Sequence, residues 1–172
     1  MSFMTTPALL MTKPTWLLSQ VSAHAHGVLA ARLGAVGARG YHVRVLAALA
    51  ELGPASQAAL GRHAAMDRSD VTATVGELAA AGLVERAADA SDRRRNVITI
   101  TAAGRIRLRE LDVILTAVQD EVLAPLTADE RFVLTGLLTR LLEGGTYRSS
   151  SKEISPVTPN MSCRGERALK KR

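Results

Sequence analysis

The chain has 172 residues, 47% of them hydrophobic and 3% aromatic, with a formal net charge of +6. This length suits one domain with a single core, and a core built from Leu, Val and Ala favours helices. No apolar run is long enough to span a bilayer, and the single cysteine, Cys163, excludes an intramolecular disulfide, so we expect a protein without membrane association in a reducing, cytoplasmic setting.

The N-terminal half contains three helical patterns. Residues 1–13 are expected to form a flexible N-terminus without a secretion signal. Pro14 then opens an apolar stripe with helical spacing that continues to about Leu33. Tyr41 to Leu52 form a second amphipathic pattern, which Gly53 and Pro54 end. Ser56 is a favourable N-cap for a short third helix.

The middle of the chain predicts a helix followed by a β-hairpin. Asp67 is an expected N-cap for a fourth helix, and Gly82 is the residue type that ends helices. Leu83–Ala88 and Asn96–Ile100 are the two strand candidates. The polar loop 89–95 separates them.

Two further helices and a basic tail complete the chain. Thr101 caps a long helix to about Leu123, and Thr127 with Glu130 forms a capping box for a last helix. Residues 144–172 carry seven Lys and Arg against two Asp and Glu, whereas the preceding residues carry 15 against 14. We expect this tail to be disordered. The pI of about 10.2 is therefore weak evidence for a nucleic-acid partner.

The fourth helix has the pattern of a DNA recognition helix. Val71, Val75 and Leu78 follow the spacing i, i+4, i+7 and form its expected buried stripe. The other side carries small or short polar residues, flanked by one arginine: Arg68, Ser69, Thr72, Ala73 and Gly76. Small side chains allow close approach to base edges in a major groove about 12 Å wide. The residues alone leave open a helix–helix contact on this face.

The loop between the strands is the second DNA-binding candidate. It contains Asp92, Arg93, Arg94 and Arg95, and three consecutive arginines repel one another. An arginine at the tip of a ribbon can enter the minor groove of DNA, whose negative potential attracts it. Asp92 is expected to pair with one of these arginines or to bond to the loop backbone. The alternative is a solvated hairpin end.

The sequence contains no predicted catalytic or metal site. His24 and His26 are two residues apart on a helix and point to nearly opposite sides, while His42 and His63 are isolated in the sequence. Cys163 lacks a resolving partner. No Ser/His/Asp or paired-carboxylate arrangement has suitable spacing, so we expect no enzyme activity, no metal and no cofactor.

The chain resembles the MarR family of winged-helix transcription regulators over roughly residues 16–142. The resemblance is carried by four segments: DRSDV (67–71), LAAAGLVER (78–86), DASDRRRN (89–96) and ITITAAG (98–104). It implies a mainly α fold with a small β-ribbon wing, as a winged helix-turn-helix domain over 14–143. The DNA-binding lobe would cover 41–100, and dimerisation helices would cover 14–35 and 101–143.

The resemblance also implies a function and assigns roles to residues. It implies a homodimer that binds double-stranded DNA at a near-palindromic operator, as a repressor. Carried over by position, Ser69, Thr72, Ala73 and Gly76 face the groove. Asp92 and Arg94 match the family's wing pair, with Arg94 the groove-inserting residue, although Ala90 stands where the family often has proline. A small-molecule effector, bound between the dimer helices and the lobe, is a further hypothesis.

Dimerisation has support from the residues themselves. The first helix presents Leu17 and Val21, and the last presents two nearly continuous apolar faces with Val133, Leu137 and Leu141 among them. A second copy is the simplest cover for such helices in a small domain. The alternative function is a winged-helix protein-interaction module that uses the Ala-rich helix face to bind a partner.

Overall fold

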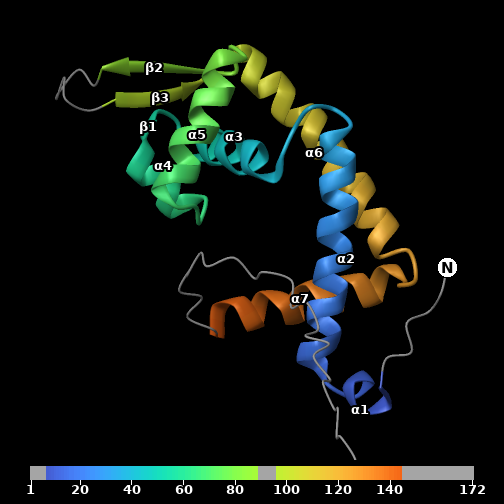
Figure 1. The fold of residues 1–172 in the computed structure, drawn as a ribbon. Coiled ribbons are helices and arrows are strands. Elements are labelled where there is room, and N and C mark those ends of the chain that lie inside the picture. The colour runs from blue at the N-terminus through green and yellow to red at the C-terminus, as the bar shows by residue number, and fades with distance from the viewer. Residues whose placement is uncertain (1–6, 89–95, 145–172) are drawn as a thin grey trace, which may run out of the picture.

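The computed structural model describes residues 7–88 and 96–144, which form a small lobe and a long helical arm (Figure 1). The fold is mainly α with a small antiparallel sheet, as the sequence predicts. Its elements in chain order are α1 (Ala8–Met11), α2 (Pro14–Gly34), α3 (Gly40–Leu52), β1 (Ala55–Ser56), α4 (Gln57–His63), α5 (Arg68–Ala80), β2 (Val84–Ala88), β3 (Asn96–Ile100), α6 (Ala102–Val122) and α7 (Ala128–Gly144).

The core lies in the lobe, between α3, α4, α5 and the sheet. Leu46 and Leu49 of α3 meet Val71 and Val75 of α5 and Ile98 of β3, and all five side chains are fully buried. Burying a side chain of this size contributes about 1.5–3 kcal/mol, so these contacts fix α5 on the lobe. One face of α5 is therefore committed to the core.

The sheet has the order β1–β3–β2, with both pairs antiparallel. Val84 pairs with Ile100 and Ala88 with Asn96, so the β2–β3 ribbon extends away from the core (Figure 1). The short strand β1 was not predicted, because two residues are too few to show a periodic pattern. Its pairing with β3 places Ser56 at the start of α4.

The predicted helix ends are confirmed at most positions. The hydroxyl of Ser56 accepts a hydrogen bond from the Ala59 amide, and that of Thr101 accepts one from the Gly104 amide at 3.0 Å. Thr127 and Glu130 form the predicted reciprocal capping box. Asp67 does precede α5, but the expected side-chain cap is wrong, because its carboxylate accepts no hydrogen bond from the helix. Gly82 follows α5 with a φ of 70°.

The arm consists of α2 and α6, which lie side by side, and α7, which follows α6 after a short turn (Figure 1). Arg32 of α2 pairs with Glu121 of α6 at 2.7 Å. Arg131 joins the start of α7 to α6 through Asp120 at 3.0 Å. The predicted flexible N-terminus contains the four-residue helix α1, which packs on α2. Among residues 7–88 and 96–144, no helix is both long and apolar enough to cross a membrane.

Candidate nucleic-acid interface

Helix α5 has one buried face and one exposed face, as the residue spacing predicts. Val71 and Val75 are fully buried, and Leu78 and Thr74 are nearly so. The other face exposes four of the five residues selected from the sequence: Arg68, Ser69, Thr72 and Ala73. No described element packs on this face near Ser69 and Ala73. The exposed row is therefore slim enough to enter a groove about 12 Å wide.

Gly76, the fifth of these residues, is half-buried because an arginine of the ribbon lies beside it. A Cβ at Gly76 would lie 3.6 Å from the Nη2 atom of Arg86 on β2. The Arg86 guanidinium therefore lies in van der Waals reach of this position on the outer face of α5, and a methyl side chain would also fit there. Arg86 was not among the DNA-binding residues predicted from the sequence. The alternation of side chains along a strand could have placed it, because this alternation puts Arg86 on the same face of β2 as buried Val84.

The hydroxyl of Thr72 is already engaged within the lobe. It lies 2.8 Å from the carbonyl oxygen of Arg68 and 3.0 Å from Oε1 of Gln57 on α4. Because a hydroxyl has one proton, these two acceptors share it, and the oxygen keeps the capacity to accept a hydrogen bond. Thr72 can therefore offer an incoming base an acceptor and a methyl group. Gln57 was not predicted as a partner of Thr72, because it lies 15 residues away in the chain.

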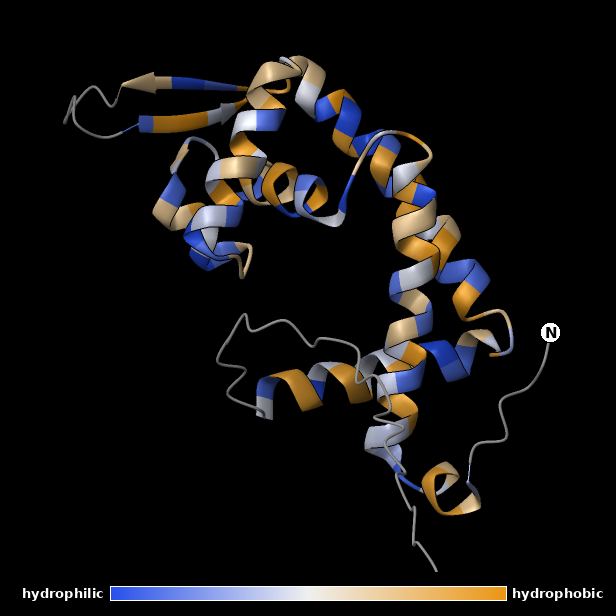
Figure 2. Ribbon diagram, viewed as in Figure 1, coloured by the Kyte–Doolittle hydropathy of each residue, from blue (hydrophilic) through white to orange (hydrophobic). Residues whose placement is uncertain are grey.

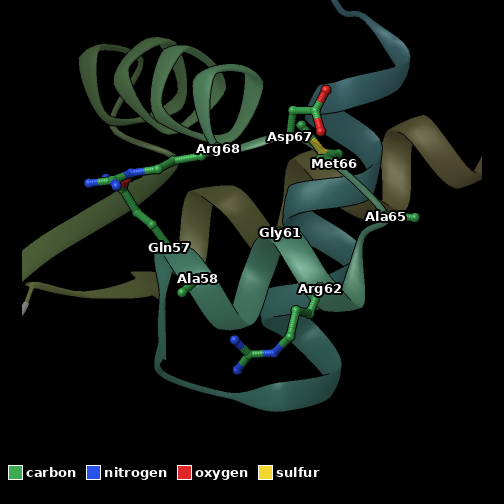
Figure 3. Close-up of a pocket in the computed structure, with 8 residues that line it drawn as sticks. All are labelled: Gln57, Ala58, Gly61, Arg62, Ala65, Met66, Asp67 and Arg68. Carbon is green, nitrogen blue, oxygen red and sulfur yellow. The ribbon is translucent and has the colours of Figure 1, made fainter. Parts of the chain in front are cut away.

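A hollow with a volume of about 710 Å³ lies between α4 and the start of α5 (Figure 3). Gln57, Arg62 and Arg68 line it, and Figure 3 shows the ends of Gln57 and Arg68 close together while Asp67 points away from them. Neither arginine forms an ion pair within the described part of the chain. Such guanidinium groups are suited to phosphate oxygens.

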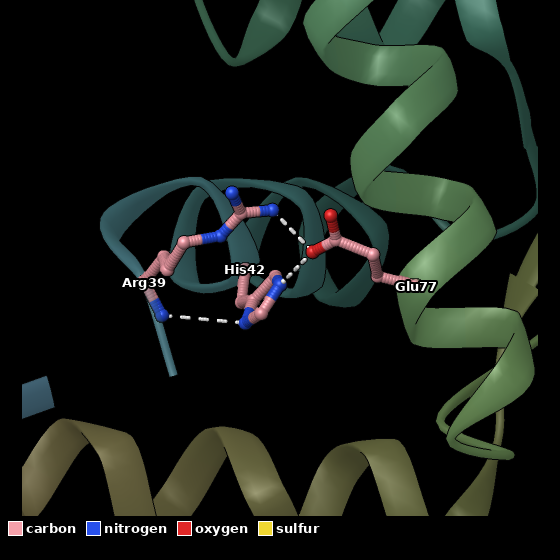
Figure 4. Close-up of polar contacts among 3 residues, drawn as sticks. All are labelled: Arg39, His42 and Glu77. Atoms are coloured by element: carbon pink, nitrogen blue, oxygen red, sulfur yellow. Dashed lines mark hydrogen bonds and ion pairs between the residues drawn. The ribbon is translucent and has the colours of Figure 1, made fainter. Parts of the chain in front are cut away.

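Three charged or polar side chains hold the other end of α5 to α3 (Figure 4). Glu77 of α5 accepts hydrogen bonds from Arg39, just before α3, and from Nε2 of His42 at 2.8 Å. These bonds, that of His42 first and that of Arg39 second, hold the pKa of Glu77 below its usual value. The backbone amide of Arg39 donates to Nδ1 of His42 at 3.3 Å, which orients the imidazole.

The first turn of α5 is also close to α3. Burial first, and then the negative charge of Asp70, raise the pKa of Tyr41. Asp70 therefore faces α3, away from the exposed row of α5. The guanidinium of Arg44 lies 5.9 Å from the centre of the Tyr41 ring and donates a long hydrogen bond, 3.5 Å, to the carbonyl of Ala65 in the turn before α5. Helix α3 thus contacts both ends of α5 and the preceding turn.

The four candidates in the loop between the strands, Asp92, Arg93, Arg94 and Arg95, lie outside the described residues. The structure fixes only the strands that flank them. The β2–β3 pairing continues to Ala88 and Asn96. Their assigned roles stay predictions.

The histidines have partners that the sequence did not reveal. His42 contacts Glu77, and Nε2 of His63 lies 2.6 Å from Oε2 of Glu51. Within residues 7–88 and 96–144, no group of three or more His, Cys, Asp or Glu side chains has a geometry suited to a metal ion.

The sequence and the fold of this chain are similar to those of known proteins. A crystal structure of a probable transcriptional regulator from Pseudomonas aeruginosa is 33% identical, with a TM-score of 0.69, and the match covers 77% of this chain and 99% of that one. A sequence model of the MarR family matches residues 37–95, from just before α3 to the loop after β2. The chain belongs to the MarR family. Its winged-helix fold is the one that the resemblance predicted.

Two other relatives of this MarR-family protein are named regulators. The HTH-type transcriptional repressor NicR of Pseudomonas putida is 30% identical over 98 residues, which are 57% of this chain and 62% of the repressor. The match thus spans less than two thirds of that curated relative. The PcaV transcriptional regulator of Streptomyces coelicolor is 26% identical with a TM-score of 0.66, covering 77% of this chain and 97% of that one.

Proposed function

We propose that this MarR-family protein is a transcriptional regulator that binds double-stranded DNA in a sequence-specific manner. The observation that carries the proposal is the exposed row of α5, formed by Ser69, Thr72 and Ala73, opposite a fully packed core face. In this function the row enters the major groove and reads base edges. Gly76 lets the helix lie close to the DNA.

Cations around the row supply the contacts with the DNA backbone. Arg62 and Arg68 line the hollow beside the start of α5, and Arg86 lies next to Gly76. These guanidinium groups bind phosphates on both sides of the groove. In the loop between the strands, Arg94 enters the neighbouring minor groove with Asp92 as its partner, and Arg93 and Arg95 contact phosphates.

The regulator acts as a homodimer on a near-palindromic site. The apolar faces of α7 and α2 are exposed in the single chain, and they support an interface formed by residues 14–35 and 101–143 (Figure 2). The homodimer then carries two copies of the DNA-binding lobe of residues 41–100. Two-fold symmetry sets the two half-sites about one helical turn, roughly 10 bp, apart. Residues 144–172 lie outside this unit as a basic tail.

The relatives suggest the direction of regulation. The Pseudomonas putida relative is named a repressor, and the Streptomyces coelicolor regulator is known in a complex with its natural ligand. We assign this protein the same role, a repressor whose DNA affinity a small molecule controls. A ligand that favours a dimer with mismatched recognition helices would release the DNA.

Selection of bound fragments from a random pool of duplex DNA tests the proposal. The expected result is enrichment of an inverted repeat whose halves are about one helical turn apart. Enrichment of direct repeats or single half-sites would contradict the two-fold arrangement. No enrichment above the input pool would contradict specific DNA binding altogether.

The exposed, Ala-rich face of α5 also supports a second function, that of a protein-interaction module. The two functions differ in their dependence on salt. Displacement of counterions from phosphates makes DNA affinity fall steeply with salt concentration, whereas an apolar protein contact changes little. A partner protein that binds with nearly constant affinity across salt concentrations, without DNA, would favour the second function.

A further inference from the structure

The hydroxyl proton of Thr72, in the exposed row of α5, is used within the protein. Oγ1 of Thr72 lies 2.8 Å from the carbonyl oxygen of Arg68 and 3.0 Å from Oε1 of Gln57 on α4. A hydroxyl has one proton and two lone pairs, so neither acceptor leaves a proton for DNA. A Gln57 amide turned over would donate to Oγ1, and the proton would then stay on the Arg68 carbonyl. In both arrangements Thr72 can only accept a hydrogen bond from a base.

Gln57 is held beside Thr72 by the way α4 packs on α5. The preceding residue, Ser56, pairs with β3 and caps α4, which fixes the start of this helix. Gln57 and Gly61 are four residues apart and therefore lie on the same face of α4. A Cβ at Gly61 would lie 3.1 Å from the carbonyl oxygen of Met66, so α4 approaches the turn before α5 closely on this face. Figure 3 shows Gln57 reaching from α4 towards the start of α5.

The chemistry of the major groove turns this acceptor into a selective contact. An ordinary threonine hydroxyl rotates to donate or to accept, so it distinguishes the four bases poorly. In the major groove adenine presents the N6 amino group and cytosine the N4 amino group, whereas the O6 of guanine and the O4 of thymine are acceptors. An oxygen without an available proton can bond to the first two and repels the last two.

We propose that Gln57 and Thr72 form a specificity-determining pair that selects an adenine or a cytosine on one strand of each half-site. The inference rests on the proposed function, because it names the base class that the exposed row of α5 reads. Thr72 contacts the amino group of the base. Gln57 is a positioning residue, because it blocks the second direction in which the Thr72 hydroxyl could turn. Without Gln57, the proton could leave the Arg68 carbonyl for an acceptor on a base.

The amino group is tested by removing it from the DNA. The fragment comes from selection with the full chain, and the base pair read by Thr72 is the one whose preference changes in Thr72→Val. At that pair, on each strand in turn, purine replaces adenine or 2-pyrimidinone replaces cytosine. Loss of the amino group should weaken wild-type binding by about fivefold, the usual net effect of one hydrogen bond. Thr72→Val should bind both fragments almost equally, whereas Thr72→Ser, which keeps the hydroxyl, should still distinguish them.

The role of Gln57 is tested by Gln57→Met, which keeps the length of the side chain but removes the amide. The dependence on the amino group should fall below about twofold, because the hydroxyl regains its ability to donate. In a Thr72→Val background the same change should leave the base preference unaltered, as expected for residues that act through one contact. Arg62→Gln is the control, because Arg62 lines the same hollow and should alter affinity without altering the dependence.

The outcomes separate this inference from the proposed function. Specific DNA binding that does not depend on an amino group at the Thr72 position, or is unchanged in Thr72→Val, would overturn this inference alone. A dependence that persists in Gln57→Met, or a loss of affinity there that is equal for all fragments, would overturn the role of Gln57. Failure of the selection to enrich any fragment would overturn the proposed function instead.

Discussion

Gly104, in the first turn of α6, lies where any larger residue would clash with the backbone. A Cβ at this position would lie 2.1 Å from the carbonyl oxygen of Leu83, which is backbone and cannot swing aside. The glycine thereby allows α6 to begin against β2, where Thr101 donates to the carbonyl of Gly82 at 2.9 Å. This contact joins the lobe to helix α6 of the arm.

The first prediction concerns Gly104→Ala. The forced shift of α6 should lower the free energy of unfolding by about 1–3 kcal/mol, the usual cost of overpacking, and this is measured by urea denaturation. Gly27→Ala in α2 is the matched control, because nothing lies within 4 Å of its added Cβ. Gly27→Ala should raise the free energy of unfolding by about 1 kcal/mol, because alanine has a higher helix propensity than glycine. Equal effects of the two changes would refute the steric argument.

The second prediction concerns base preference at Thr72. Thr72→Ala removes both the Oγ1 oxygen that can accept from a base and the γ-methyl group that can contact one, so the preferred base at one position of each half-site should change. Repeating the DNA selection with the variant measures this. Arg62→Gln is the control, since loss of a phosphate contact should weaken binding to all sequences alike. An unchanged preference in Thr72→Ala would remove Thr72 from the reading residues.

At the residue scale, the sequence predicts which face of a helix is buried, because the spacing of apolar residues within the segment shows it. The spacing of Val71, Val75 and Leu78 correctly identified the buried face of α5, because helix geometry repeats within the segment. The bond from Arg39 to Glu77 spans 38 residues, and that of Thr72 to Gln57 spans 15. Such contacts depend on how the helices pack, which no period within one helix contains.

At the element scale, α5 is held at each end by α3. The third prediction follows from the lowered pKa of Glu77. A carboxyl whose pKa is lower in the folded protein stabilises the fold above its ordinary pKa of 4.5, and this stabilisation disappears as the pH falls through the lowered value. Wild type should therefore exceed Glu77→Gln in stability near neutral pH, and the difference should shrink in acid.

Urea midpoints of both proteins across this pH range measure the difference. Glu110→Gln is the control, because Glu110 pairs within α6 with Arg107 and does not contact α5. A gap between wild type and Glu77→Gln that stays constant, or widens, as the pH falls below 4.5 would show that the Glu77 charge does not stabilise the lobe.

Element boundaries were predictable where caps are local. Ser56, Thr101 and the pair of Thr127 and Glu130 act within one helical turn, and all were identified from the sequence. Strand β1 and helix α1 were not, because each has four residues or fewer and depends on a neighbour, β3 and α2 respectively. The expected cap by Asp67 failed although its position was right.

At the scale of the whole molecule, α7 is the element that the single chain leaves least covered. It contacts α6 mainly through Arg131 and otherwise exposes apolar side chains (Figure 2). Phe132 is 82% exposed, Leu141 61% and Leu142 66%. Apolar surface of this extent in a small protein indicates an interface.

The fourth prediction is that Leu141→Glu raises the dissociation constant of the homodimer by at least about tenfold, because it places a charge in an apolar contact. Sedimentation equilibrium measures this. Ala73→Glu is the control, since Ala73 is exposed on α5 and lies outside the proposed interface of residues 14–35 and 101–143. A wild-type protein that sediments as a monomer, or a Leu141→Glu variant that dimerises as wild type does, would contradict the proposed interface.

The central claim, that the exposed face of α5 and its surrounding arginines bind duplex DNA, is tested most directly by the salt dependence of binding to a selected fragment. The logarithm of the binding constant should fall linearly with the logarithm of salt concentration, by about 0.9 for each phosphate contact. Arg68→Gln should reduce this slope by about one, and Arg140→Gln on α7 should leave it unchanged. A flat dependence in wild type, or equal slopes in wild type and Arg68→Gln, would contradict the claim.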